Sequence, residues 1–207
     1  MIMNDYERGM NMGQKSQIYL RANGKLVFAN YYGWNYGERM ISRARYGIEW
    51  VKYFIAMKYD WVFSDPAYIT KMRRVFDVNF DMKDVAISQD IVQEHADLFA
   101  DDDFNDYVFN KQGNNDGQLY VDIKGDKIYY CFRDWTRHSD GTTSDTIMSA
   151  SEYMDWDAED WENSEYITDE GKAACRDNIK AIEEMAELMT MEQLDDFIGG
   201  DYEPKPF

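Results

Sequence analysis

The stretch that decides the fold is residues 16–57, which read SQIYLRANGKLVFANYYGWNYGERMISRARYGIEWVKYFIAM. Two runs rich in Ile, Tyr, Leu, Val and Phe, residues 17–20 and 25–29, lie on either side of Asn23-Gly24. Asn-Gly tolerates the positive φ angles that both central residues of a tight hairpin turn require. The first part of the stretch is therefore predicted to form an antiparallel β-hairpin.

A long helix, spanning about residues 36–58, is predicted to follow this hairpin. Asn35 is its expected N-cap, and Glu38 is the capping-box partner three residues further on. At about 100° per residue, one face of the helix is apolar and is predicted to face the core. This core stripe consists of Met40, Ile41, Ala44, Ile48, Val51 and Ile55.

Another stripe of the same helix combines arginines with aromatic rings. Its members are Arg39, Arg43, Tyr46, Trp50 and Tyr53. The guanidinium groups could lie on the rings while both cover the hairpin or a later helix, which is the more common arrangement. The stripe could instead be an exposed binding face, because Arg, Tyr and Trp are the usual anchors of interfaces. The sequence leaves both interpretations open.

A second hairpin is predicted for residues 118–123 and 127–132, with its turn at Lys124-Gly125-Asp126. Between the hairpins, apolar residues at helical spacing predict a helix over about residues 88–100. After the second hairpin, the polar residues 139–145 are expected to form a flexible loop, where a domain sub-boundary could fall.

Two further helices are predicted near the C-terminus, with Thr168 as the N-cap of the first. The second begins with a capping box of Thr190 and Gln193 and ends at Gly199-Gly200. The predicted fold class is α+β, with two antiparallel hairpins that one sheet could join and several helices packed on one face. The predicted organisation is a flexible arm, a single domain and a mobile tail, at residues 1–14, 15–200 and 201–207.

Charge is distributed unevenly along the chain, which holds 22 basic and 40 acidic residues in 207 and has a net charge of −18. Residues 1–75 hold 12 basic and 6 acidic residues, a net of +6, whereas residues 76–207 hold 10 and 34, a net of −24. Such a charge repels free nucleic acid. It attracts basic protein surfaces, including those that normally hold DNA or RNA.

A cytoplasmic location is expected from the cysteines and the apolar segments. Cys131 and Cys175 lie far apart in sequence, and buried thiols in a reducing compartment are the usual state of such residues. The N-terminus lacks a basic start followed by an apolar run, so no signal peptide is predicted. No apolar segment approaches the ~18 residues that a membrane span requires, so no membrane partner is expected.

No residue pattern predicts a catalytic, metal or cofactor site. His95 and His138 are the only histidines, so the usual zinc patterns fail. The NNDG sequence at residues 114–117 resembles the centre of a calcium loop, but its flanks lack the ligands, and a turn is predicted. Cys131 and His138 are seven residues apart, which gives little support to a thiol enzyme. Hydrolysis by a pair of carboxylates stays open in a chain with 40 acidic residues.

The most unusual composition is that of residues 149–166, SASEYMDWDAEDWENSEY, with seven acidic and no basic residues from Glu152 to Glu165. Carboxylates beside aromatic rings can imitate the phosphates and stacked bases of a nucleic acid and compete for its basic groove. The alternative is a solvated amphipathic helix whose Trp and Tyr side chains pack inward. The candidate partner-binding residues are Glu152, Asp155, Trp156, Asp157, Glu159, Asp160, Trp161 and Glu162.

Two segments and the acidic, Met-rich C-terminal end carry a resemblance. The segments read SQIYLRANGKLVFANYYGWNYGERMISRARYGIEW and GNNDGQLYVDIKGDKIYYCFRDW. They resemble uncharacterised small acidic proteins encoded by phages and prophages of Gram-positive bacteria, over most of the chain after residue 14. The resemblance carries no catalytic motif, so it implies no functional residue. By analogy, small acidic phage proteins often inhibit host defence, and anti-CRISPR proteins are among them.

The leading hypothesis is therefore a non-enzymatic inhibitor that binds a basic, nucleic-acid-handling host protein, with a CRISPR effector nuclease as the favoured target. The alternative is a small enzyme that acts on a host defence or signalling molecule. A third hypothesis is a structural phage component. No cofactor and no direct binding of nucleic acid are expected, and a homodimer is compatible with the sequence.

Overall fold

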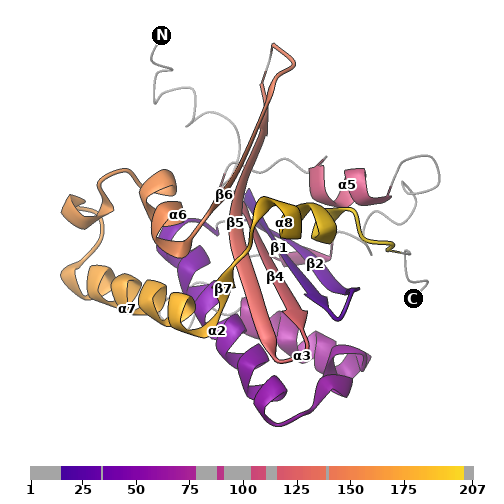
Figure 1. Cartoon of the computed structure of the whole chain (residues 1–207). Coiled ribbons are helices and arrows are strands. Elements are labelled where there is room, and N and C mark those ends of the chain that lie inside the picture. The colour runs from indigo at the N-terminus through magenta and orange to yellow at the C-terminus, as the bar shows by residue number, and fades with distance from the viewer. Residues whose placement is uncertain are drawn as a thin grey trace.

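The computed structural model describes residues 15–33, 35–77, 88–90, 104–110, 116–138 and 140–202, and it has the predicted α+β fold (Figure 1). The strands are β1 (Lys15–Ala22), β2 (Lys25–Gly33), β3 (Ser88–Asp90), β4 (Gln118–Lys124), β5 (Lys127–Arg137), β6 (Thr143–Met148) and β7 (Glu187–Leu188). The helices are α2 (Gly37–Ala56), α3 (Pro66–Asp77), α5 (Phe104–Asn110), α6 (Ala150–Asp157), α7 (Asp169–Met185) and α8 (Met191–Ile198), with short 3-10 helices η1 (Asp60–Phe63) and η3 (Trp161–Asn163).

One mixed sheet joins the two predicted hairpins. Its strand order is β3-β2-β1-β4-β5-β6, and β7 pairs with β5 beside this path. The antiparallel pairs β1–β2 and β4–β5 are the two hairpins that the sequence predicts. They meet through a parallel pairing of β1 with β4, in which Ile18 lies opposite Leu119 and Leu20 lies opposite Val121. Because β1 and β4 run in the same direction, both hairpin turns lie at the same end of the sheet.

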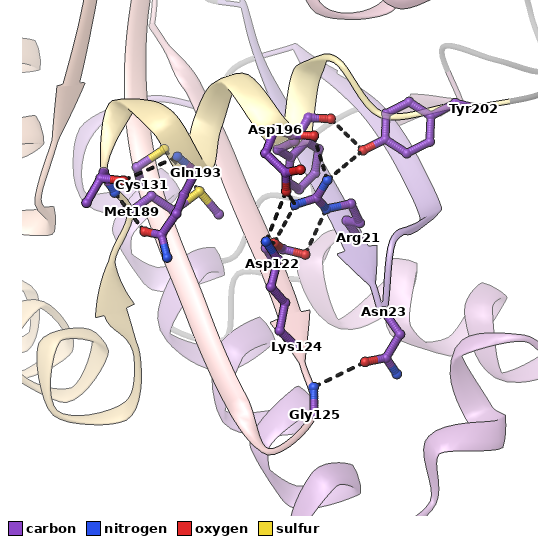
Figure 2. Close-up of polar contacts among 12 residues, drawn as sticks. Arg21, Asn23, Asp122, Lys124, Gly125, Cys131, Met189, Gln193, Asp196 and Tyr202 are labelled. Carbon is purple, nitrogen blue, oxygen red and sulfur yellow. Dashed lines mark hydrogen bonds and ion pairs between the residues drawn. The ribbon is translucent and has the colours of Figure 1, made fainter.

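The two hairpin turns contact each other through an asparagine side chain. Asn23 and Gly24 adopt φ angles of 49° and 81°, as the Asn-Gly turn requires, and Gly125 adopts a φ of 65°. The backbone N–H of Gly125 donates a hydrogen bond to the side-chain oxygen of Asn23 at 3.1 Å (Figure 2). Asn23 therefore both shapes its own turn and links the first hairpin to the second.

Apolar side chains alternate between two cores on opposite faces of the sheet. Ile18 and Val121 belong to the larger core, which α2, α3, α6 and α7 complete. Tyr19 and Tyr120, one residue along each strand, belong to a second core that α5 and α8 complete. Figure 1 shows α8 crossing one face of the sheet while α2 lies on the other. The prediction that helices pack on one face only is therefore wrong.

Helix α2 confirms the predicted long helix and its core stripe. Met40, Ile41, Ala44, Ile48 and Val51 are fully buried, and Ile55 packs partly buried against the same core. The predicted cap is wrong, because the N-cap is Tyr36, which makes no side-chain cap hydrogen bond. Asn35 is buried instead, donates to the Ser16 hydroxyl at 2.6 Å and accepts a hydrogen bond from Arg43. Asn35 thus fastens the start of α2 to the start of β1.

A network of charged side chains holds α8 on the sheet (Figure 2). Arg21 on β1 donates to both carboxylate oxygens of Asp122 on β4, at 2.9 and 2.6 Å. The same guanidinium donates to the Asp196 carboxylate of α8 at 2.8 Å, and it lies over the ring of Phe197, 4.6 Å from the centroid. Arg21 and Asp122 are only 3% and 2% exposed, so they form a bidentate buried ion pair.

The predicted ends of the C-terminal helices are confirmed. The Thr168 side chain accepts a hydrogen bond from the Gly171 N–H at the start of α7. Thr190 and Gln193 form the capping box of α8, and Gly199 is its C-cap. These caps were predictable because each involves residues within one turn of the helix end.

Three segments differ from the expectations. The last three residues of the expected loop 139–145 belong to β6, which pairs with β5. Residues 88–90 form β3 beside β2, and not the start of a helix over 88–100. The remainder of that helix and the expected arm 1–14 lie outside the described residues. Tyr202, in the expected mobile tail, is 9% exposed and packs in the second core. Within the described helices, none is long and apolar enough to cross a membrane.

Candidate functional site

The candidate partner-binding residues lie on α6, on η3 and on the turn between them. All their carboxylates except that of Asp157 belong to exposed residues. Glu152 already has a role in α6, because its carboxylate accepts the Ser149 N–H at 2.8 Å in a capping box that the sequence analysis missed. That N–H and the Ser149 hydroxyl lower the pKa of Glu152. Glu162 forms a surface ion pair with Arg176.

The aromatic residues of this segment divide between the core and the surface. Tyr153 is fully buried and stacks on Phe132 with the ring centroids 4.3 Å apart. Trp161 is 5% exposed and belongs to the larger core. Trp156 is 37% exposed, so it is the tryptophan of this segment that a partner can reach. The inward-packing interpretation thus describes Tyr153 and Trp161, whereas Trp156 lies at the surface among exposed carboxylates.

Asp157 caps the N-terminus of α2, where the N-cap residue Tyr36 makes no side-chain hydrogen bond of its own. Its carboxylate accepts a hydrogen bond from the backbone N–H of Gly37, the first residue of α2. Gly37 adopts a φ of 45°, and a Cβ built there would lie 3.1 Å from a carboxylate oxygen of Asp157. Burial raises the pKa of Asp157 to about 6, the Gly37 N–H opposes this rise, and the nearby Glu38 adds to it. The positive end of the helix dipole explains why this carboxylate lies there.

Asp116, which the sequence analysis gave no role, lies beside this cap. It is 6% exposed, and its backbone carbonyl accepts the Tyr153 hydroxyl at 2.9 Å. Burial, and then repulsion from Asp157, raise the pKa of Asp116 to about 7, although a backbone N–H of Lys15 lowers it in part. Among the described residues, its Oδ2 atom has no hydrogen-bond partner. We call Asp116 and Asp157 the carboxyl pair.

Trp156 and Gly117 border the carboxyl pair. Gly117 follows Asp116 in the chain with a φ of 82°. A Cβ built on it would lie 3.4 Å from the Trp156 ring and 3.3 Å from the Tyr153 ring. The glycine is therefore needed for both its backbone conformation and the close approach of the two rings.

Two carboxylates elsewhere in the described chain are paired with buried arginines. Asp122 is paired with Arg21, as described above. Arg133, 3% exposed, donates to both carboxylate oxygens of Asp145 at 2.7 Å each. Within the described part of the chain, no cationic side chain is among the groups that shift the pKa of Asp116 or of Asp157. The carboxyl pair thus consists of one buried and one half-buried acid, with no guanidinium beside them among the described residues.

This arrangement can hold a proton near neutral pH or accept a positively charged group. A raised pKa near 7 is also typical of a general acid or base. Across the described ranges, no group of three or more His, Cys, Asp or Glu side chains is placed to hold a metal ion.

The possible thiol site is not assembled. Cys131 is fully buried, with its sulfur 3.7 Å from that of Met189, whereas His138 is exposed. Since both residues are on or next to the extended strand β5, seven residues separate them by roughly 23 Å.

The arginine–aromatic stripe of α2 is partly packed and partly exposed. Arg43 is fully buried and lies over the Tyr32 ring, 5.2 Å from its centroid. Arg39 and Tyr46 are half-buried, and Trp50 packs partly buried against the larger core. Tyr53 is 55% exposed, and further exposed aromatic or apolar side chains follow it within eight residues of the chain. These are Met57, Tyr59 and Trp61.

A comparison of the chain with protein-family models, with curated proteins and with solved structures found no significant match. The candidate site therefore rests on its own geometry. Asp157 and Trp156 were among the candidate residues predicted from the sequence, whereas Asp116 was not. The available signal was an acidic residue directly before Gly117 at the entry of a buried strand.

Proposed function

We propose that the protein is a non-enzymatic inhibitor that binds a basic, nucleic-acid-handling protein through the acidic surface of α6 and η3. The observation that carries the proposal is the grouping of exposed carboxylates with the partly exposed Trp156. Asp155, Glu159 and Asp160 are exposed, and no basic residue interrupts the chain from Glu152 to Glu165. We call these three carboxylates and Trp156 the acidic face.

The acidic face would bind where a nucleic acid normally lies. Carboxylates attract the lysines and arginines that neutralise phosphates, and an exposed indole ring can occupy the place of a stacked base. The net charge of −18 adds a long-range attraction that speeds the encounter with a basic surface. Occupation of the groove would exclude the nucleic acid, and the inhibitor would need no chemistry of its own.

The resemblance to small acidic phage proteins supports a bacterial host as the setting of this inhibition. A CRISPR effector nuclease is the target that we favour, because its guide and target strands lie in a positively charged channel. The proposal places the protein in the cytoplasm of the infected cell, where such a nuclease acts.

Size-exclusion chromatography with light scattering tests the proposal. The protein is mixed with a guide-loaded CRISPR effector nuclease at low and at high salt, and we expect a complex that weakens as salt is raised. A variant with Asp155→Asn, Glu159→Gln and Asp160→Asn should lose the complex and keep its fold.

The matched control removes three exposed carboxylates from the α8 side of the molecule. It carries Glu192→Gln, Asp195→Asn and Asp201→Asn, which change the net charge equally and should leave the complex nearly intact. Equal weakening by both variants would mean that overall charge and not the acidic face drives binding. A complex that is equally stable at low and high salt would indicate binding through the exposed aromatic side chains near Tyr53.

A small enzyme is the second candidate, and the carboxyl pair is the observation that favours it. Two acids whose pKa values are raised to about 7 and about 6 could act as a general acid and base near neutral pH. Stoichiometry separates the two functions, because an inhibitor saturates near one molecule per target whereas an enzyme acts at far lower ratios.

A further inference from the structure

We propose that Asp116 and Asp157 together receive one arginine side chain of the basic partner, with Trp156 beside its guanidinium. This inference rests on the proposed function, because it names the group of the partner that the acidic face binds most specifically. The carboxyl pair is then the centre of the contact, and the exposed carboxylates around it steer the partner.

The first observation is the unused hydrogen-bonding capacity of Asp116. Its Oδ2 atom is buried and has no partner in the described part of the chain. Asp157 accepts the Gly37 N–H at the start of α2, whereas Asp116 interacts with the backbone N–H of Lys15 and still has its Oδ2 atom unpaired among the described residues. A buried acceptor without a donor is unfavourable unless a ligand supplies one.

The second observation is the pairing of two other carboxylates of this chain with arginine, the buried Asp122 and the partly exposed Asp145. Asp122 receives Arg21, and Asp145 receives Arg133, each through two hydrogen bonds of 2.6 to 2.9 Å. In both cases the guanidinium also lies near an aromatic ring, at 4.6 Å from the Phe197 centroid and 6.0 Å from that of Trp135. The recurring unit is therefore a carboxylate, an arginine and a ring.

The carboxyl pair has two parts of this unit. It supplies the carboxylate oxygens, and Trp156 supplies a partly exposed ring close to Gly117, the residue after Asp116. Asp157 is only half-buried, so a side chain of the partner can approach the pair from the side of Asp157 and Trp156. Arginine fits better than lysine, because a planar guanidinium can donate to two oxygens and lie on a ring at once.

Binding of arginine should release a proton. At pH 6.5 Asp116 is largely protonated, since burial and Asp157 raise its pKa to about 7. A guanidinium favours the charged carboxylate, so the proton of Asp116 passes to the buffer as the ion pair forms. The other titratable groups that act on the carboxyl pair are Glu38 on α2, Tyr153 on α6 and Tyr31 on β2. The tyrosines, whose pKa values are raised by burial, stay neutral at this pH.

Isothermal titration calorimetry with a hexa-arginine peptide tests the inference at pH 6.5 and low salt. Runs in two buffers of different ionisation enthalpy give the number of protons released. We expect the wild type to release about three-quarters of a proton, which is the protonated fraction at pH 6.5 of a group with a pKa of about 7. We expect Asp116→Asn to release almost none and to bind about tenfold more weakly. Hexa-lysine should bind more weakly than hexa-arginine and release fewer protons.

Asp155→Asn is the matched control, because it removes one exposed carboxylate from α6, the helix that carries Asp157. It should weaken binding slightly through charge alone and leave proton release unchanged. Equal effects of Asp116→Asn and Asp155→Asn, or no binding of hexa-arginine to the wild type, would overturn the inference. Circular dichroism of each variant confirms that its fold is kept.

The chromatographic assay with the nuclease separates this inference from the proposed function. If the wild type binds the nuclease and the double variant Asp116→Asn/Asp157→Asn binds it equally well, the arginine site is wrong and the inhibitor function stands. If the wild type does not bind the nuclease but releases a proton to hexa-arginine, the arginine site stands and that target is wrong.

Discussion

Replacement of Asp116 by Asn should stabilise the protein above neutral pH. Burial raises the pKa of this carboxyl from 3.8 to about 7, and one pKa unit corresponds to ~1.4 kcal/mol, so ionisation costs the folded state roughly 4 kcal/mol. The amide keeps the shape of the side chain and carries no charge. Allowing ~1 kcal/mol for poorer hydrogen bonding to the Lys15 N–H, we expect a gain of about 3 kcal/mol at pH 8.

The sign of the pH dependence follows from proton binding. Between about pH 4 and pH 7 the folded state holds a proton on Asp116 that the unfolded state has lost. The contribution of Asp116 to the free energy of unfolding therefore falls as the pH rises through this window, and it is constant above it. The variant should thus be ~1 kcal/mol less stable than the wild type near pH 4, through its poorer hydrogen bonding, and should become the more stable protein towards pH 8.

Urea denaturation of both proteins at pH 4, 5, 6, 7 and 8 measures this divergence. A gain of about 3 kcal/mol corresponds to a shift of the midpoint on the order of 1 M urea. Asp155→Asn serves as the control, because its exposed carboxylate experiences the same overall charge without the burial. A difference between wild type and Asp116→Asn that does not change with pH, or a variant less stable at pH 8, would refute the reasoning.

Three other substitutions or treatments test the remaining parts of the structure. Gly37→Ala should lower the free energy of unfolding by about 1–2 kcal/mol, because residue 37 has a φ of 45° and the new Cβ would crowd Asp157. Gly33→Ala is the control and should cost less, because a Cβ there has open space. Arg21→Met should cost roughly 3–5 kcal/mol by leaving the buried Asp122 with only the partly exposed Lys124 ammonium, 3.6 Å away. Arg21→Met/Asp122→Leu should recover much of that loss, and an additive loss in the double variant would contradict the ion-pair argument. Burial raises the pKa of Cys131, and it raises the pKa of Cys175 to about 12. A thiol reagent at pH 8 should therefore label neither cysteine in the native protein and both in urea. Rapid labelling without urea would show that these thiols are accessible.

The parts of the fold that the sequence predicted are those set by neighbouring residues. Asn23-Gly24 specifies its hairpin because the turn itself needs the two positive φ angles. The long helix was predictable because its buried residues recur at the helical period, and the caps of α7 and α8 lie within one turn of the residues they satisfy.

The second core was missed because its residues look amphipathic in the sequence. Tyr19 and Tyr120 alternate with the apolar residues of their strands, which is typical of a face turned to water. Both are fully buried, and the Tyr19 hydroxyl has a partner far away in the sequence, because it donates to the Val108 carbonyl at 2.8 Å. A pairing over 89 residues has no local signal, so the pattern alone could not place α5 and α8 on this face.

The start of α2 shows the same competition between local and distant contacts. Asn35 and Glu38 fit a local capping rule, yet Asn35 is buried between β1 and α2 and the cap comes from Asp157, 120 residues along the chain. One carboxylate of the carboxyl pair and its neighbouring tryptophan were therefore predictable from the composition of the sequence. Asp157 and Trp156 stand in a segment of unusual composition, whereas Asp116 stands in a polar turn and becomes notable only when the fold buries it.

Replacement of Asp116 by Asn is expected to stabilise the free protein and to weaken its binding of arginine. This opposition between stability and binding is the strongest argument that the carboxyl pair has a function. A cost of roughly 4 kcal/mol is a large part of the 5–15 kcal/mol by which a typical domain is stable. The chain pairs the buried Asp122 with an arginine of its own, so its fold can accommodate a buried carboxylate without this cost. Functional sites are where such unfavourable local arrangements are retained. If the amide raises stability and abolishes proton-linked arginine binding together, the cost in the free protein is the energy that the partner's arginine recovers on binding.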